Sequence, residues 1–171
     1  MLKEYVATPE FVTNSHMVTK GVTFDASKFR DKYAKAGTVV GIVSATGKAR
    51  PVAVTTLSSA VSTSTTLNVA DASWFVVGDS ITVGSGSATT ITDIDYDNNV
   101  ITVADAQTAD AGETVKLADG AQVPVGIVAE NVSLEKGDNI GAILVHGFVD
   151  KSKLANYDAS FDSQLPLILF E

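Results

Sequence analysis

The chain of 171 residues is long enough for one ordinary domain or two small ones, and its 45% hydrophobic content excludes an intrinsically disordered protein. The absence of cysteine excludes disulfides, thiolate metal sites and a cysteine nucleophile. The formal net charge is −8 and no apolar run approaches the roughly 20 residues that span a bilayer, so neither nucleic acid nor a membrane is an expected partner.

The first segment, residues 1–20, shows neither a helical nor a strand period, and Pro9 and Asn14 interrupt it. No signal-peptide core opens it, so we expect the protein to stay in a cytoplasm or in a particle assembled there. Two interpretations remain open: a frayed terminus, or an arm that becomes ordered on a partner. The apolar side chains of such an arm are Tyr5, Val6, Phe11 and Val12.

The next segment, residues 24–35, favours a short helix in which Asp25 or Ser27 is the N-cap. Phe29 and Tyr33 are four residues apart and would share one face of that helix. One or two helical turns with extended flanks are an equal alternative.

Residues 36–51 predict a strand, a tight turn and the start of a second strand. The β-branched residues suit a pleated, half-buried surface, and Gly41 among them indicates a bulge or a close backbone approach. Further along the chain, Val125-Gly-Ile-Val-Ala129 repeats the pattern of Val40-Gly-Ile-Val-Ser44. We therefore predict one small β domain that opens after Pro51 and closes again near Val123.

The segment inserted between these two halves, residues 53–121, has a different charge. It contains nine acidic residues and one basic residue, Lys116, hence a net charge of −8, so the rest of the chain sums to zero. This asymmetry predicts a separately solvated module on a host domain whose balanced charge suits close protein contacts.

The inserted segment also contains an internal repeat. Leu67–Val83 is echoed by Ile101–Leu117, and each copy reads as a strand, an Ala-Asp-Ala turn and a second strand. A hairpin is predicted around residues 97–99, and the number of short strands indicates a small closed or half-open barrel. Trp74 and Phe75 are the expected core anchors, although Trp74 could instead be a stacking platform for a sugar or a base.

Behind the insertion, strands are predicted over residues 123–128, 140–149 and 165–170. A tight turn is expected at residues 136–138 and a capped helical turn over residues 150–157. So apolar a tail should be buried, either in its own core or at a subunit contact.

Asp93, Asp95 and Asp97 alternate like the start of a calcium-binding loop. The sixth position of that loop is Asn98 instead of glycine and the twelfth is Ala104 instead of glutamate, so the calcium pattern fails. We interpret the three carboxylates as the solvated tip of the hairpin.

Each of the two histidines, His16 and His146, is predicted to stand alone in a structural role. No hydrolase elbow, zinc-binding helix motif or phosphate loop is present, and no nucleophile, base and orienting group come together. We therefore expect no catalytic site, no metal, no cofactor and no enzymatic activity.

Four stretches of the host domain, in this order, resemble the head decoration proteins of tailed bacteriophages, the family typified by lambda protein D. They are Ala36-Gly-Thr-Val-Val-Gly-Ile-Val43, Gly47-Lys-Ala-Arg-Pro51, Val125-Gly-Ile-Val-Ala-Glu130 and Ala142-Ile-Leu-Val-His-Gly-Phe-Val149. The resemblance covers about residues 20–52 and 122–150. The inserted segment departs from the family, whose members usually have a short loop at that place.

The resemblance implies a mainly β protein in which a small β-rich decoration domain, with one or two short helices, carries an inserted small β-barrel-like domain. The expected divisions are a capsid-binding arm over residues 1–20, the decoration domain over 21–52 and 122–171, and the insertion over 53–121.

The resemblance also implies a homotrimer on the outer surface of an expanded phage head, at three-fold positions, which stabilises the head against the pressure of packaged DNA. The arm would contact the major capsid protein through Tyr5, Val6, Phe11 and Val12. The alternative is a surface or tail-associated β module that recognises a glycan or receptor through the inserted domain, with Trp74 as its platform.

Overall fold

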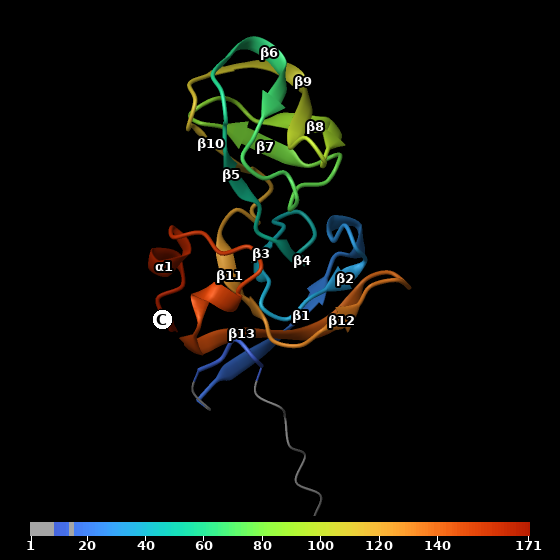
Figure 1. The fold of residues 1–171 in the computed structure, drawn as a ribbon. Coiled ribbons are helices and arrows are strands. Elements are labelled where there is room, and N and C mark those ends of the chain that lie inside the picture. Colours follow the sequence, from blue (N-terminus) through green and yellow to red (C-terminus); the bar gives the residue numbers. More distant parts are fainter. Residues whose placement is uncertain (1–8, 14–15) are drawn as a thin grey trace, which may run out of the picture.

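The computed structural model describes residues 9–13 and 16–171. The chain is mainly β, with 47% strand and 6% helix, as the sequence predicts. Its strands form two separate units stacked one above the other (Figure 1). We call the unit built from residues 18–51 and 124–170 the carrier barrel, and the unit built from residues 54–117 the inserted barrel.

The carrier barrel is a closed ring of five strands. They are β1 (Val18–Phe24), β3 (Val39–Ile42), β4 (Ala49–Pro51), β11 (Pro124–Val128) and β13 (Asn139–Val149). The ring closes because β1 pairs along β13 and also meets β4 at Phe24–Ala49. Every strand contributes a buried side chain to the interior: Phe24, Val40, Ala49, Val128 and Ile143.

The outer face of this ring is covered by the C-terminal segment. That segment consists of η2 (Lys151–Lys153), the helical turn α1 (Phe161–Gln164) and β14 (Ile168–Phe170), which pairs in parallel with β13. The buried side-chain amide of Asn156 connects this segment to the ring. It accepts from the Val39 N–H at 2.7 Å and donates to the carbonyls of Val39 and Val52 at 2.9 Å.

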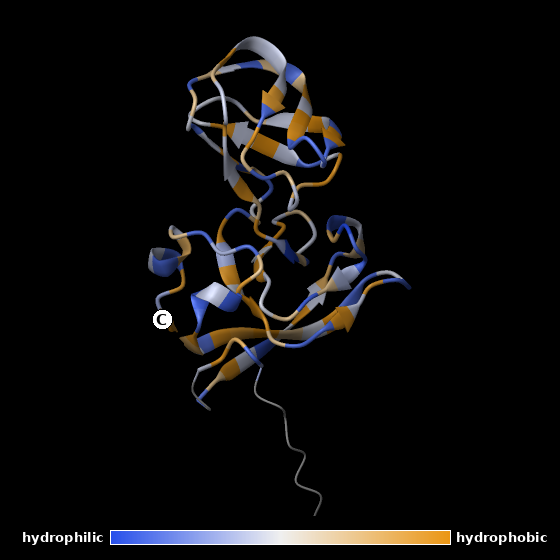
Figure 2. Ribbon diagram, viewed as in Figure 1, coloured by the Kyte–Doolittle hydropathy of each residue, from blue (hydrophilic) through white to orange (hydrophobic). Residues whose placement is uncertain are grey.

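Apolar residues concentrate on the strands of both units (Figure 2).

The inserted barrel has six strands in the order β5-β10-β7-β8-β9-β6. Its two ends meet at an isolated bridge between Leu57 and Val69, which closes the sheet. Phe75 is fully buried in its core, as predicted. The strands are β5 (Val54–Thr56), β6 (Val61–Asn68), β7 (Ser80–Val83), β8 (Thr89–Asp95), β9 (Val100–Ala109) and β10 (Thr114–Leu117).

Gly41 lies at the boundary between the two units, and the predicted close backbone approach is confirmed. A Cβ atom at Gly41 would lie 2.7 Å from the carbonyl carbon of Ala121, closer than real side chains come. The two ends of the insertion are adjacent, since Leu117 N–H donates to the Ala53 carbonyl at 3.3 Å.

The predicted helix over residues 24–35 is wrong. The segment contains one turn, η1 (Ala26–Lys28), followed by β2 (Tyr33–Ala34), which pairs with β12 (Val132–Ser133). Asp25 does cap the turn by accepting from the Ser27 N–H at 3.0 Å. Phe29 is buried in the barrel interior whereas Tyr33 is exposed, so the two rings do not share a face. The extended alternative therefore describes this segment better.

The internal repeat is only partly a structural repeat. In the first copy Asp71 accepts from the Ser73 N–H at 2.8 Å and makes the expected turn. In the second copy residues 104–106 lie within β9, because the Asp105 N–H is held by Thr89 Oγ1 at 3.1 Å on the neighbouring strand. The predicted hairpin around residues 97–99 is confirmed between β8 and β9.

Candidate functional site

Two of the four predicted capsid contacts belong to the protein's own core. Phe11 is 3% exposed and Val12 is 9% exposed, and both pack among buried residues on the outer face of the carrier barrel. The backbone is fixed there because Thr13 N–H donates to the Phe148 carbonyl and Asp150 N–H to the Phe11 carbonyl. The prediction that these two side chains reach a partner is therefore wrong, and Tyr5 and Val6 lie outside the described residues.

The arm is also shorter than predicted. β1 begins at Val18, so the last residues of the predicted segment 1–20 are already paired with β13. The first four residues of β1 are nevertheless exposed, and Val18 keeps 47% of its surface in contact with solvent. An exposed apolar residue at the start of a paired strand is a candidate contact that the sequence did not single out.

The histidines do not stand alone, which corrects the sequence-based prediction. The rings of His16 and His146 are perpendicular, with centroids 5.0 Å apart. The two residues are far apart in the sequence, and the pairing of Val18 with His146 brings them together. This contact was not predictable because neither residue has a sequence pattern around it that fixes a register.

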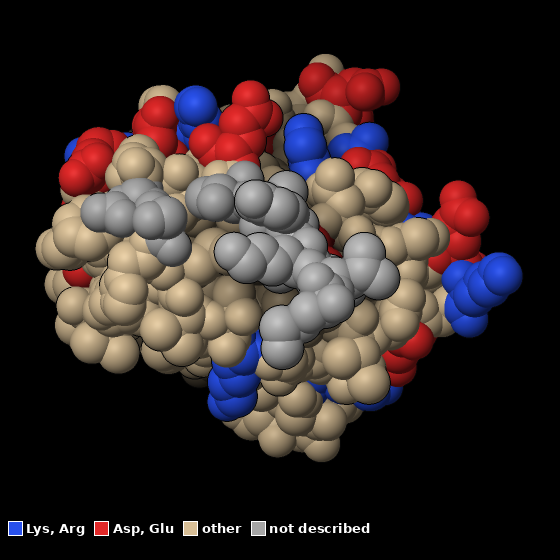
Figure 3. All heavy atoms as spheres, turned by 90° about the horizontal axis from the view of Figure 1, so that it is seen from below, with Lys and Arg blue, Asp and Glu red and all other residues tan. Residues whose placement is uncertain are grey.

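These N-terminal contacts lie at the end of the carrier barrel that is distant from the inserted barrel (Figure 1). Figure 3 shows this end directly: uncharged side chains occupy most of the visible surface outside the grey residues, and the charged side chains lie mainly toward its rim. We call this surface the lower face.

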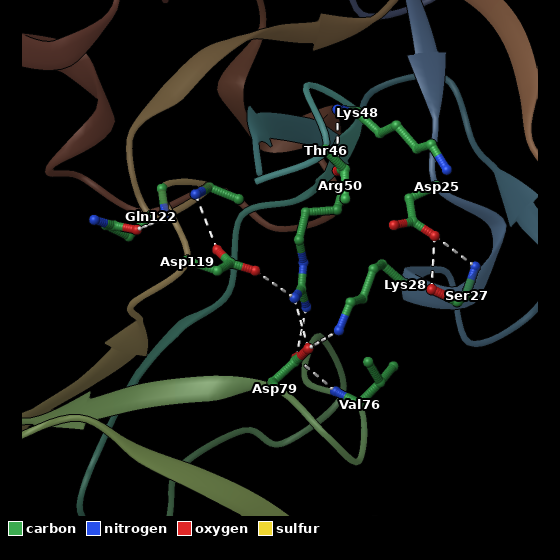
Figure 4. A network of polar contacts seen from close by, with 12 residues as sticks. Asp25, Ser27, Lys28, Thr46, Lys48, Arg50, Val76, Asp79, Asp119 and Gln122 are labelled. Atoms are coloured by element: carbon green, nitrogen blue, oxygen red, sulfur yellow. Dashed lines mark hydrogen bonds and ion pairs between the residues drawn. The ribbon is translucent and has the colours of Figure 1, made fainter. Parts of the chain in front are cut away.

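At the opposite end of the carrier barrel, a buried ion-pair network joins it to the inserted barrel. Arg50 of β4 donates from Nη1 and Nη2 to the two carboxylate oxygens of Asp79 at 2.6 Å each, and from Nη1 to Asp119 at 3.0 Å. Lys28 donates to the same carboxylate of Asp79 at 2.9 Å. Figure 4 shows Arg50 reaching between the two aspartates. The network pairs two cations with two anions, so its net charge is zero.

The ionisation of Asp79 is set by two opposing effects. Burial of the carboxyl group favours the neutral form and would raise its pKa. The hydrogen bonds and charge of Arg50, together with the hydrogen bonds from Lys28 and the Val76 N–H, outweigh burial and hold the pKa of Asp79 below its usual value. The carboxylate is therefore charged at neutral pH, which Arg50 requires because its side chain has no exposed surface.

Trp74 lies at this junction. It lines a cleft of about 230 Å³ together with Phe29, Tyr33 and Pro51 of the carrier barrel. Arg30 also lines this cleft, and its guanidinium lies over the Tyr96 ring at 4.1 Å, a further contact between a cation of the carrier barrel and the inserted barrel. Trp74 is partly buried, packs against the core of the inserted barrel and borders this cleft, so its role as a ligand platform stays a prediction.

Of the three alternating aspartates, Asp93 and Asp95 lie in β8, and Asp97 lies in the hairpin turn that follows it. Asp95 accepts from the backbone N–H groups of Asp97 and Asn98 at 3.1 Å, and from the Asn98 side chain at 2.7 Å. These bonds lower the pKa of Asp95, the Asn98 side chain contributing most. Across residues 9–13 and 16–171, no three His, Cys, Asp or Glu side chains are arranged to hold a metal ion.

Within the described part of the chain, no helix is long and apolar enough to cross a membrane. Comparison of the chain with protein-family models, with curated proteins and with solved structures finds no match in any of the three.

Proposed function

We propose that the protein is a structural decoration protein that binds the outer surface of an expanded phage head at three-fold positions and stabilises it. The major capsid protein is its partner, and the virion surface is its location. No catalytic step belongs to this function.

The observation that carries the proposal is the opposite character of the two ends of the molecule. The lower face is largely uncharged, and β1 begins toward this end of the molecule with the exposed Val18, whereas the inserted barrel at the other end holds the acidic excess of the chain (Figures 1 and 3). The core of a protein–protein contact is depleted of charged residues, which favours docking through the charge-poor lower face. Acidic modules on neighbouring copies repel one another, which favours their exposure to solvent.

The part of the chain before Pro9 also supports this orientation. Residues 1–8 are covalently joined to the segment that pairs with β13 at Val12–Val149, next to the lower face. Tyr5 and Val6, which lie outside the described residues, are the side chains of this segment that we propose to contact the shell. Backbone pairing with a capsid strand would supply attachment, and these two side chains would fill neighbouring pockets.

The test is co-sedimentation with expanded heads that lack the protein, taken from the phage that encodes it. Val18→Asp on the lower face should reduce the bound fraction at least about tenfold, because a buried unpaired charge opposes docking. Val77→Asp, the same change at a 56% exposed valine of the inserted barrel, should bind like the unchanged protein. Equal binding of the two variants would contradict the proposed orientation.

The role of the arm is tested separately by removing residues 2–8, which leaves Phe11 and Val12 in place. We expect the shortened protein to keep its thermal unfolding temperature and to lose head binding. A removal that extends to residue 15 is unsuitable, because it would take Phe11 out of the core. Full binding after removal of residues 2–8 would assign docking to the lower face alone.

A further inference from the structure

The cleft beside Trp74 is built by both barrels, and we call it the junction cleft. Its most deeply buried lining residues are Phe29 and Pro51 of the carrier barrel. Two further rings line it, Tyr33 of β2 from the carrier barrel and Trp74 from the inserted barrel. Tyr33 is 43% exposed and Trp74 is only partly buried, so a molecule from solvent can reach both rings.

The size of the junction cleft limits what it can hold. Its volume is about 230 Å³. Pockets for drug-sized ligands measure roughly 300–1,000 Å³, so this cleft has room for about one ring with its substituents. Apolar or aromatic side chains make up most of its lining, with a few polar ones among them, which is the usual composition of a small-molecule site.

Arg30 supplies the cleft with a cation that no carboxylate neutralises. Within residues 9–13 and 16–171 its side chain makes neither an ion pair nor a hydrogen bond. Its guanidinium lies over the Tyr96 ring, and the Tyr96 hydroxyl is itself anchored by donating to the Phe75 carbonyl at 3.0 Å. Stacking uses a face of the guanidinium, whereas its five N–H donors lie in the plane and remain available to a ligand.

The cleft also has a free donor on its other wall and an acceptor beside Arg30. The Trp74 indole N–H has no acceptor in the described part of the chain, and because it is not buried it can donate to a ligand. The exposed carboxylate of Asp31 lines the cleft and forms no ion pair with any described residue. The junction cleft therefore combines aromatic walls with hydrogen-bonding groups of both kinds.

The ion pairs of the junction fix the two walls relative to each other. Lys28 lines the cleft from the carrier barrel and donates to Asp79 at 2.9 Å. The Val76 N–H, two residues after Trp74, donates to the same carboxylate at 2.9 Å, and Arg50 holds that carboxylate with two bonds at 2.6 Å. A cleft whose walls are fixed before the ligand arrives loses little conformational freedom on binding.

We infer that the junction cleft binds one pyranose ring of a saccharide. A pyranose has faces formed by C–H groups and a rim of hydroxyl groups. The C–H groups fit the electron-rich faces of Tyr33 and Trp74. The hydroxyl groups can accept from Arg30 and donate to Asp31. Both barrels contribute to this site, so it differs from a platform on the inserted barrel alone.

Binding at this cleft is independent of the proposed function, because the junction lies at the end of the carrier barrel opposite the lower face (Figure 1). The test therefore uses the full chain without heads. Trp74 is the single tryptophan, so its fluorescence and its indole N–H resonance report directly on the cleft. The probes are methyl α-glucopyranoside, methyl α-galactopyranoside, N-acetylglucosamine and glucuronic acid, each titrated alone.

At least one probe should give a saturable change in both signals, with a dissociation constant on the order of 1 mM, because a single ring has a small contact area. The absence of a saturable change with every probe up to about 50 mM would overturn the inference.

Variants locate the bound sugar. Arg30→Gln should raise the dissociation constant about tenfold or more, because it removes charge-assisted donors. Lys151→Gln, which removes the same charge from an exposed position in η2, is the matched control and should bind like the unchanged protein. Tyr33→Ala should weaken binding to a similar extent, whereas Tyr33→Phe, which keeps the ring, should retain most of it.

Thermal unfolding checks that each variant is folded. Unchanged binding by both Arg30→Gln and Tyr33→Ala would place the sugar elsewhere and overturn the inference. Head binding by a protein that ignores every sugar would overturn only the saccharide site, and sugar binding by a protein that ignores heads would overturn only the proposed function.

Discussion

Arg50 of the carrier barrel and Asp79 of the inserted barrel form a two-pronged ion pair with both bonds at 2.6 Å, and neither side chain has exposed surface. The acidic excess of the insertion is therefore not entirely a property of its solvent-facing surface. Two of its nine acids, Asp79 and Asp119, bind a cation of the carrier barrel. The two barrels are therefore joined by buried ion pairs as well as by the two segments of chain that connect them.

Asp79→Asn should destabilise the protein by about 3–5 kcal/mol, because it leaves the buried Arg50 without its main counter-charge. Urea unfolding measures the loss. Asp93→Asn, the same change at an exposed hairpin residue, should alter stability by less than about 0.5 kcal/mol. The double variant Arg50→Met with Asp79→Asn removes both fully buried charges and leaves only the partly exposed Lys28 and Asp119 without these partners, so its loss should be smaller than that of Asp79→Asn alone. A larger loss in the double variant would show that the pair is not the source of the effect.

The junction should weaken in acid. Because the folded-state pKa of Asp79 is below its unfolded value of about 3.9, its contribution is fully present above about pH 4 and is lost as the pH falls through the folded-state pKa. The difference in unfolding temperature between the unchanged protein and Asp79→Asn should therefore be constant from pH 7 to about pH 5 and shrink below about pH 4. A difference that persists at pH 2 would contradict this assignment.

Phe11→Ala should cost about 3–5 kcal/mol of folding stability, because it opens a cavity among buried residues on the outer face of the carrier barrel. Chemical denaturation checks this value. Glu10→Ala, at the exposed neighbouring position, is the control and should change stability by less than about 0.5 kcal/mol. If Phe11→Ala left stability unchanged, Phe11 would not be a core residue, and its assignment to the capsid-binding arm would stand.

The division into two domains is tested by replacing residues 55–118 with a short Gly-Ser linker. All five strands of the carrier barrel lie outside this range, and the Leu117–Ala53 hydrogen bond shows that a short linker can span the gap. Asp119 is retained so that Arg50 keeps one partner. We expect a folded carrier barrel with cooperative thermal unfolding, measured by circular dichroism. An insoluble product, or one without a cooperative transition, would contradict the two-domain interpretation.

The sequence predicts the β class, the 36–51 strand-turn-strand and the close approach at Gly41, because these depend on local preferences of β-branched residues and glycine. It fails over residues 24–35, where Phe29 could equally face a helix neighbour or a barrel interior. The pairing of β2 with β12 decides between these two environments of Phe29, and it is a tertiary contact that the local sequence does not indicate.

The candidate site was less predictable. Phe11 and Val12 show no period, so their burial against β13 could not be inferred from neighbours in the sequence. Arg50 is part of a short turn motif, and nothing near it in the sequence indicates a partner 29 residues away. The sequence signal for Asp79 is its place in the internal repeat. Gly78-Asp79 occupies the same position in the first copy as Gly112-Glu113 in the second.

Electron cryomicroscopy of expanded heads incubated with the protein tests the proposed decoration function most directly. We predict density at the three-fold positions, with the lower face of the carrier barrel against the shell and the inserted barrel pointing into solvent. Heads without added density, or density in which the inserted barrel lies against the shell, would contradict the account.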